Sequence, residues 1–106
     1  MGTQLKYLND ENFEKEISNG VTLVDFYADW CGPCRMMEPV IEELASEMSG
    51  KASIAKLDIE SAQQVTSSFN VTSIPTLILF KNKEEVERLI GVKSKDDLTR
   101  IISKHL

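Results

Sequence analysis

The sequence predicts an α/β protein in which one central mixed β-sheet of about five strands is flanked by four helices. Apolar residues alternate between a two-residue period and a helical period, in the order βαβαβ, then α, ββ and α. Two nearly continuous apolar runs, at residues 21–28 and 76–80, are typical of strands buried on both faces. A chain of 106 residues buries about two thirds of its unfolded surface in one core, so we expect a single domain over residues 1–106.

The first strand is expected at residues 4–7, followed by a helix. Asn9 or Asp10 caps this helix, which buries Phe13 and ends at residues 19–20. The Asn-Gly pair at that end is also typical of a hairpin turn, but the residues before it have a helical period. We therefore expect a helix between the first two strands.

The second strand leads directly into the longest helix. The strand covers residues 21–28, and the helix covers residues 33–48 with Gly50 as its stop signal. Apolar residues at helical spacing mark its buried face: Met37, Val40, Ile41, Leu44 and Met48. Pro39 lies inside this helix and removes one backbone hydrogen bond, so we expect a kink there.

The second half of the chain contains a strand, a short helix, a two-stranded hairpin and a last helix. They are expected at residues 53–59, around 65–69, at 76–80 with 85–90, and from residue 94 onward. Ser94 and Asp97 resemble a capping box at the start of the last helix. The hairpin turn has Asn82-Lys83 where Asn-Gly is common, and a residue with a Cβ resists the positive φ of such turns. The sequence therefore leaves the turn geometry open.

Charge and composition argue against several classes of partner. Twelve Lys and Arg stand against seventeen Asp and Glu, and this net charge of −5 does not suit nucleic acid. Residues 1–13 are polar and contain neither a secretory apolar region nor a membrane span. We therefore expect a cytoplasmic protein that binds no membrane. We also expect a monomer, because no large interface is indicated.

The only two cysteines lie in Trp30-Cys31-Gly32-Pro33-Cys34, directly after the second strand. A bridge over so short a loop stabilises a fold by about 2 kcal/mol, so it opens easily, which suits redox chemistry. Pro33 favours the first turn of a helix, and a slightly tightened turn brings the two Cβ atoms within reach of a disulfide. The free N–H groups and partial positive charge of the helix start favour a thiolate at Cys31. Cys31 is therefore the predicted nucleophile.

Two other uses of the cysteines compete with this interpretation. A zinc site needs four ligands, but the chain has no second cysteine pair and a single histidine, His105, next to its last residue. Two unreactive core cysteines do not suit Gly32-Pro33, which is a turn sequence. We therefore expect a redox-active pair and no metal.

The sequence also resembles the thioredoxin family over nearly its whole length. Four motifs carry the resemblance: Val-Asp-Phe-Tyr-Ala at residues 24–28, Trp-Cys-Gly-Pro-Cys at 30–34, Lys-Leu-Asp at 56–58 and Ser-Ile-Pro-Thr at 73–76. The resemblance implies a thioredoxin-like fold and a protein dithiol–disulfide oxidoreductase that reduces target proteins through a reversible Cys31–Cys34 disulfide. It also implies that no cofactor is bound and that electrons come from NADPH through a flavoprotein, thioredoxin reductase. This reductase and disulfide-containing target proteins are the expected partners.

Asp25 lies in the middle of a strand that we expect to be buried. A buried carboxylate is costly unless it is paired or protonated, so its pKa is expected to be raised, which marks a functional candidate. The resemblance implies that Asp25 lies behind the disulfide and accepts the proton of Cys34. It also implies that Lys56 pairs with Asp25, and that Gly32 and Pro33 tune the redox potential. The alternatives are a carboxylate held by structural hydrogen bonds and an exposed lysine at a strand end.

The resemblance further implies a binding surface for an extended substrate chain. The Ile74-Pro75 peptide bond is expected to be cis and to face the cysteines, with the Ile74 backbone pairing to the substrate. Gly91 lets that chain approach closely. An apolar rim completes the surface: Trp30, Ile59, Ile74 and Val92. Without the resemblance, these four residues indicate ordinary core packing.

Two other functions compete with disulfide reduction. A disulfide oxidase or isomerase uses the same kind of motif, although Gly32-Pro33 resembles the reducing thioredoxins. A non-catalytic binding or chaperone-like module would use the surface around Trp30 and Pro75, with the thiols incidental. Loss or retention of activity after both cysteines are replaced separates this module from an enzyme.

Overall fold

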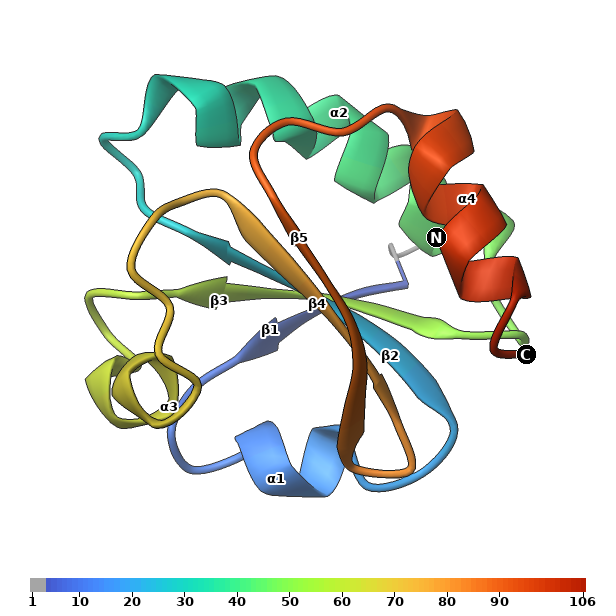
Figure 1. Ribbon diagram of the computed structural model, residues 1–106, viewed down its shortest axis with the longest axis horizontal. Helices are drawn as coiled ribbons and strands as arrows, with labels where there is room; N and C mark the ends of the chain where they lie inside the picture. The colour runs from blue at the N-terminus through green and yellow to red at the C-terminus, as the bar shows by residue number, and fades with distance from the viewer. Residues whose placement is uncertain (1–3) are drawn as a thin grey trace.

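Five strands and four helices alternate along residues 4–106, the part of the chain that the computed structural model describes (Figure 1). In chain order they are β1 (Leu5–Leu8), α1 (Phe13–Glu16), β2 (Val21–Tyr27), α2 (Gly32–Glu47), β3 (Ser53–Asp58), α3 (Gln63–Ser68), β4 (Thr76–Lys81), β5 (Glu84–Ile90) and α4 (Lys95–Ser103). The predicted fold class is confirmed, and no strand boundary differs from its predicted position by more than one residue.

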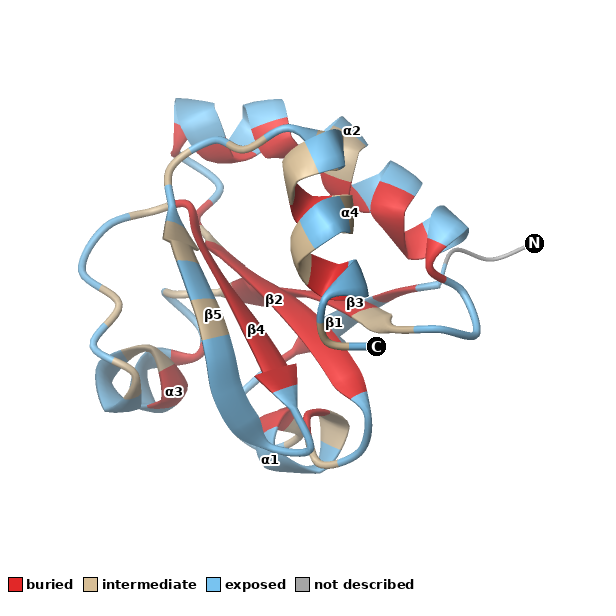
Figure 2. Cartoon of the chain, turned by 45° about the vertical axis from the view of Figure 1, so that its right-hand side comes forward, coloured by how far each residue is buried: buried red, intermediate tan, exposed pale blue. Residues whose placement is uncertain are grey.

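The five strands form one mixed sheet in the order β1-β3-β2-β4-β5. β3 pairs in parallel with β1 and β2, whereas β4 pairs antiparallel with β2 and β5. β2 is therefore the central strand, and Figure 2 shows it buried along most of its length. Its carboxyl end delivers the chain to the start of α2, where the two cysteines lie.

A hydrophobic core lies on each face of the sheet, because successive side chains of a strand point to opposite faces. Leu77 and Leu79 of β4 belong to the core that includes the buried faces of α2 and α4. Ile78 and Phe80 belong to the core shared with α1 and α3. Figure 1 shows the two helix pairs on opposite sides of the sheet. Both faces of the sheet are therefore covered, which explains the nearly continuous apolar run of β4.

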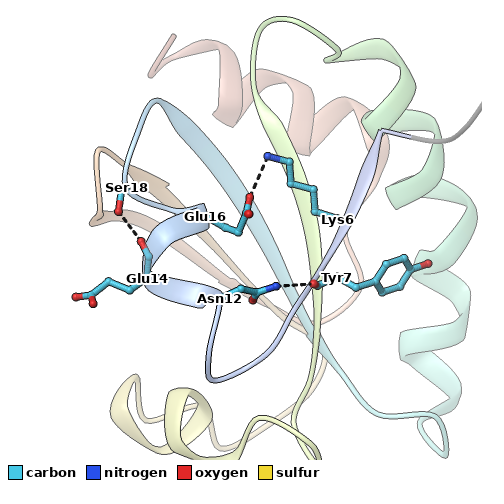
Figure 3. Close-up of polar contacts among 6 residues, drawn as sticks. All are labelled: Lys6, Tyr7, Asn12, Glu14, Glu16 and Ser18. Atoms are coloured by element: carbon cyan, nitrogen blue, oxygen red, sulfur yellow. Dashed lines mark hydrogen bonds and ion pairs between the residues drawn. The ribbon is translucent and has the colours of Figure 1, made fainter.

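The segment around α1 differs from its predicted form. α1 has only four residues, and the Asn9 and Asn12 side chains accept hydrogen bonds from each other's backbone N–H at 2.8 Å. Asn12 Nδ2 also donates to the Tyr7 carbonyl at 3.2 Å, which ties this segment to β1 (Figure 3). The carboxylate of Asp10 instead accepts a hydrogen bond from the Val65 N–H at 3.0 Å. Asp10 therefore caps α3, far along the chain, and Asn9 holds the turn before α1.

Three local features can be compared with what the sequence indicates. Asn82 and Lys83 both have positive φ, 49° and 82°, so the hairpin turn keeps the geometry that Asn-Gly usually adopts. Ser94 Oγ accepts the Asp97 N–H at 3.1 Å and caps α4 as predicted. α2 continues on both sides of Pro39 without interruption.

Candidate active site

The two cysteines lie at the start of α2 and form a disulfide with each other. Their Cα atoms are 5.2 Å apart, within the usual range for a disulfide. Cys31 is the N-cap residue with extended backbone, and its Sγ accepts the Cys34 N–H at 3.2 Å. Pro33 lies in the first turn of the helix, as its fixed φ favours. The sulfur of Cys31 therefore occupies the position where a helix start stabilises negative charge.

Both cysteines are nearly buried, with exposed fractions of 5% for Cys31 and 3% for Cys34. They pack with Ala28, and Ile59 and Ile74 lie partly buried against this cluster. The Ile74 carbonyl oxygen lies 3.9 Å from Cys31 Sγ, and the Ile74-Pro75 peptide bond is cis, as the resemblance implies. The segment before β4 is therefore placed directly against the disulfide.

Asp25 is completely buried in the middle of β2, and neither of its carboxylate oxygens accepts a hydrogen bond from any protein group in residues 4–106. Burial raises the pKa of Asp25 from 3.8 to about 7, although the Lys56 charge opposes this rise and the Glu38 charge adds to it. A carboxylate held by structural hydrogen bonds is therefore the wrong description of Asp25. The group instead exchanges a proton near neutral pH.

Lys56 is nearly buried on β3, where it is the register partner of Asp25. Its Nζ lies 3.7 Å from Glu38 Oε2 and 4.2 Å from the centroid of the Tyr27 ring. The predicted direct pairing with Asp25 is wrong, because the Asp25 oxygens have no partner and the ammonium is bound by other groups. The exposed strand-end alternative is also wrong. Lys56 acts on Asp25 through its charge.

The predicted apolar rim has an exposed part and a packed part. Trp30 is 64% exposed and Val92 is 44% exposed, whereas Ile59 and Ile74 are half-buried. The Trp30 Nε1 donates to Glu60 Oε2 at 2.6 Å, so the exposed indole is held in one orientation.

Gly91 connects this surface to the segment beside the cysteines. Its N–H donates to the Pro75 carbonyl at 2.9 Å, and its φ is +95°. A Cβ built on Gly91 would meet no atom within 4 Å. The positive φ therefore explains glycine at this position within the fold, since crowding by the chain itself does not.

Two charged residues at the site were missed by sequence reasoning. Glu38, which contacts Lys56, lies four residues after Cys34, and this helical spacing was a usable signal. Glu60, which binds Trp30, gave no signal, because the two residues are 30 positions apart in the sequence.

Residues 4–106 show neither a metal-binding cluster nor a membrane-spanning helix. They hold no group of three or more His, Cys, Asp and Glu side chains arranged to bind a metal ion. None of their helices is long and apolar enough to span a bilayer.

Comparisons with known proteins agree on one family. The thioredoxin family model matches residues 4–104. Thioredoxin from Staphylococcus saprophyticus is 50% identical over 99 residues, which cover 93% of this chain and 95% of the relative. Thioredoxin from Chlamydia muridarum is 50% identical over 101 residues, which cover 95% and 98%. The structure of a mutant thioredoxin from Halobacterium salinarum superposes with a TM-score of 0.89 at 38% identity, covering 99% of this chain and 95% of that one. The chain therefore belongs to the thioredoxin family and is a dithiol–disulfide oxidoreductase whose redox group is the Cys31–Cys34 pair.

Proposed function

We propose that this protein is a cytoplasmic, monomeric reductant of disulfides in other proteins, and that residues 1–106 act as one domain. Two observations support the proposal: a cysteine pair at the start of α2, and a completely buried acid in the middle of β2, the strand that leads into α2, whose pKa is raised to about 7. Electrons would arrive from NADPH through a flavoprotein, thioredoxin reductase. The reductase and the target proteins are the proposed partners, and neither a membrane nor nucleic acid is among them.

In the first step the Cys31 thiolate attacks one sulfur of a target disulfide. The target S–S bond breaks, a mixed disulfide forms between Cys31 and the target, and the second target sulfur leaves as a thiolate. The position of Cys31 as N-cap of α2 supports its role as nucleophile, because the Cys34 N–H donates to its Sγ and the partial positive charge of the helix start favours a negative sulfur. Gly32 and Pro33 set the shape of this turn and thereby tune the potential.

In the second step the thiol of Cys34 loses its proton to Asp25 and attacks Cys31. The mixed disulfide breaks, the Cys31–Cys34 disulfide forms, and the remaining target sulfur leaves as a thiolate that takes a proton from water. A base with a pKa of about 7 suits this transfer, because the carboxylate is present at neutral pH and is basic enough to draw the proton. Asp25 is thus the proposed base, and Lys56 tunes it.

The target chain would bind beside the disulfide. Trp30 and Val92 offer exposed apolar surface, and the Ile74 backbone lies against Cys31, where an extended peptide would add as a strand. Ile59, Pro75 and Gly91 shape the floor of this surface. Because the cysteines themselves are almost buried, contact with this rim has to precede the attack by Cys31.

Replacement of Cys34 by Ser tests the two steps. The variant keeps the nucleophile and lacks the resolving thiol, so it should accumulate one equivalent of covalent complex with an oxidised target protein. Mass spectrometry of the unreduced mixture measures this complex, and Cys31→Ser is the matched control that should form none. Continued turnover by Cys34→Ser would contradict the resolving role of Cys34.

A binding or chaperone-like module is the second candidate, and the exposure of Trp30 and Val92 favours it. It predicts that the double variant Cys31→Ser/Cys34→Ser keeps full biological activity. Loss of that activity, with target binding retained, would support the reductase.

A further inference from the structure

The ammonium of Lys56 lies between two possible carboxylate partners. It is the register partner of Asp25 across the β2–β3 pair, yet its Nζ lies 3.7 Å from Glu38 Oε2. The Lys56 side chain is only 10% exposed, whereas that of Glu38 is 49% exposed. The lysine therefore reaches from the buried sheet toward the surface, where its ammonium forms an ion pair with Glu38 of α2.

A second contact holds the ammonium in the same place. Lys56 Nζ lies 4.2 Å from the centroid of the Tyr27 ring, a distance suited to a cation–π interaction. Glu38 and Tyr27 thus bind the ammonium together. A nearly buried ammonium needs such partners, because desolvation of an unpaired charge is costly.

We propose that Glu38 is a positioning residue that holds the Lys56 ammonium away from Asp25, so that the buried carboxyl group stays unpaired and available for proton transfer. This inference rests on the proposed role of Asp25 as the base for Cys34. No protein group of the described residues hydrogen-bonds to either oxygen of Asp25, which is the expected consequence if Lys56 is bound elsewhere.

The charged and titratable groups around Asp25 support this assignment. β3 contributes Lys56 and, at the register position opposite Tyr27, Asp58. α2 contributes Glu38, which adds to the raised pKa of Asp25. On β4 the register partner of Asp25 is the apolar Leu77, and the charged residue of this strand, Lys81, lies opposite Val21 at the other end of the pairing.

β1 and β2 complete these surroundings with two tyrosines. Tyr7 of β1 is the register partner of Lys56, and Tyr27 lies two residues after Asp25 on β2. Burial raises the pKa of Tyr27 to about 12, so this phenol stays neutral across the range in which Asp25 titrates. Lys56 is thus the positive charge that acts on Asp25, and Glu38 is the group on α2 that binds it.

Replacement of Glu38 by Gln tests the proposal. The amide keeps the length of the side chain but removes the charge that binds the ammonium, so Lys56 is drawn toward Asp25. We expect the titration midpoint of the Asp25 carboxyl group to fall by about one pH unit, a tenfold change in its dissociation constant. Carboxyl-carbon NMR of the oxidised protein measures this midpoint without any activity assay.

Two further variants identify the cause of the shift. Glu42→Gln removes the same charge from an exposed position one turn along α2 and should leave the midpoint unchanged. Lys56→Met keeps the apolar stem without the ammonium, and in this background Glu38→Gln should no longer shift the midpoint. An equal shift with and without Lys56 would overturn the proposal, because Glu38 would then act directly on Asp25. An unchanged midpoint in Glu38→Gln would overturn it as well.

The kinetic consequence separates this proposal from the proposed function. In Glu38→Gln the pH profile for the rate of Cys34 attack on a preformed Cys31 mixed disulfide should shift to lower pH, by the same amount as the NMR midpoint of Asp25. If the midpoint moves but the pH profile of the attack does not, the positioning role of Glu38 stands and the assignment of Asp25 as the base for Cys34 is wrong.

Discussion

Replacement of Asp25 by Asn should make the protein more stable, by an amount that grows with pH. In the folded protein the carboxyl group is completely buried without hydrogen-bond partners, and its pKa is raised from 3.8 to about 7. Between these two values the folded state binds more protons at this position than the unfolded state. The stability of the native protein therefore falls as the pH rises through this window.

The size of the effect follows from the same two values. Each unit of difference between the folded and unfolded pKa corresponds to about 1.4 kcal/mol, so ionisation of Asp25 costs the folded state about 4 kcal/mol above pH 7. Asn has nearly the same shape and never ionises. The advantage of Asp25→Asn over the native protein should therefore be small near pH 4 and increase by about 4 kcal/mol by pH 8.

Urea unfolding of the oxidised proteins at intervals between these pH values measures the two free energies of unfolding. Asp96→Asn is the matched control, because it removes an exposed carboxyl group from α4. The difference in free energy of unfolding between Asp96→Asn and the native protein should not grow with pH. If the free energies of unfolding of the native protein and Asp25→Asn change in parallel with pH, the reasoning is refuted. Parallel curves would mean that ionisation of the buried carboxyl group does not destabilise the folded state.

Two further predictions concern local structure, and both use the urea midpoint. Asp10→Ala should destabilise the protein by about 1 kcal/mol, because the Val65 N–H at the start of α3 loses its acceptor, whereas Asp10→Asn should keep most of the stability. Equal loss in both variants would contradict the capping role. Lys83→Gly should stabilise the protein by about 1 kcal/mol, since glycine adopts the φ of 82° without strain and the exposed Lys83–Glu14 ion pair contributes little. High salt screens the Lys83–Glu14 ion pair in the native protein, so only the backbone strain at residue 83 then separates the two proteins. If Lys83→Gly is no more stable than the native protein in high salt, the strain argument is wrong.

Much of the fold was predictable because the interactions that define it are local. The periods of the apolar residues located all nine elements, since side chains repeat every two residues on a strand and every three to four on a helix. Ser94 as a cap of α4 and Pro33 in the first turn of α2 were also predictable, because each acts within a few residues of its own position. The length of α1 was not predictable, because its end depends on contacts outside its own residues.

The candidate site was predictable to a similar extent. The spacing of Cys31 and Cys34 allows a disulfide across one helical turn, and the small number of further metal ligands in the sequence favours it over a zinc site. The burial of Asp25 also followed from its position in an apolar run, and the raised pKa followed from burial. The partner of Lys56 did not follow, because the resemblance implied Asp25, whereas the packing of α2 on the sheet brings Glu38 within reach of the ammonium.

The sequence by itself therefore determined the redox pair, the helix that begins at it, and a carboxylate that has to be buried. These features depend on neighbours within one turn or one strand. Only the tertiary structure decided which charges surround that carboxylate, which residue holds the Trp30 indole, and that Asp10 caps α3. Each of these contacts joins residues that are distant in the sequence, at separations of 18 residues for Lys56 with Glu38 up to 55 for Val65 with Asp10. Such contacts form only when the strand order and the helix packing bring distant residues together, and no local pattern encodes them.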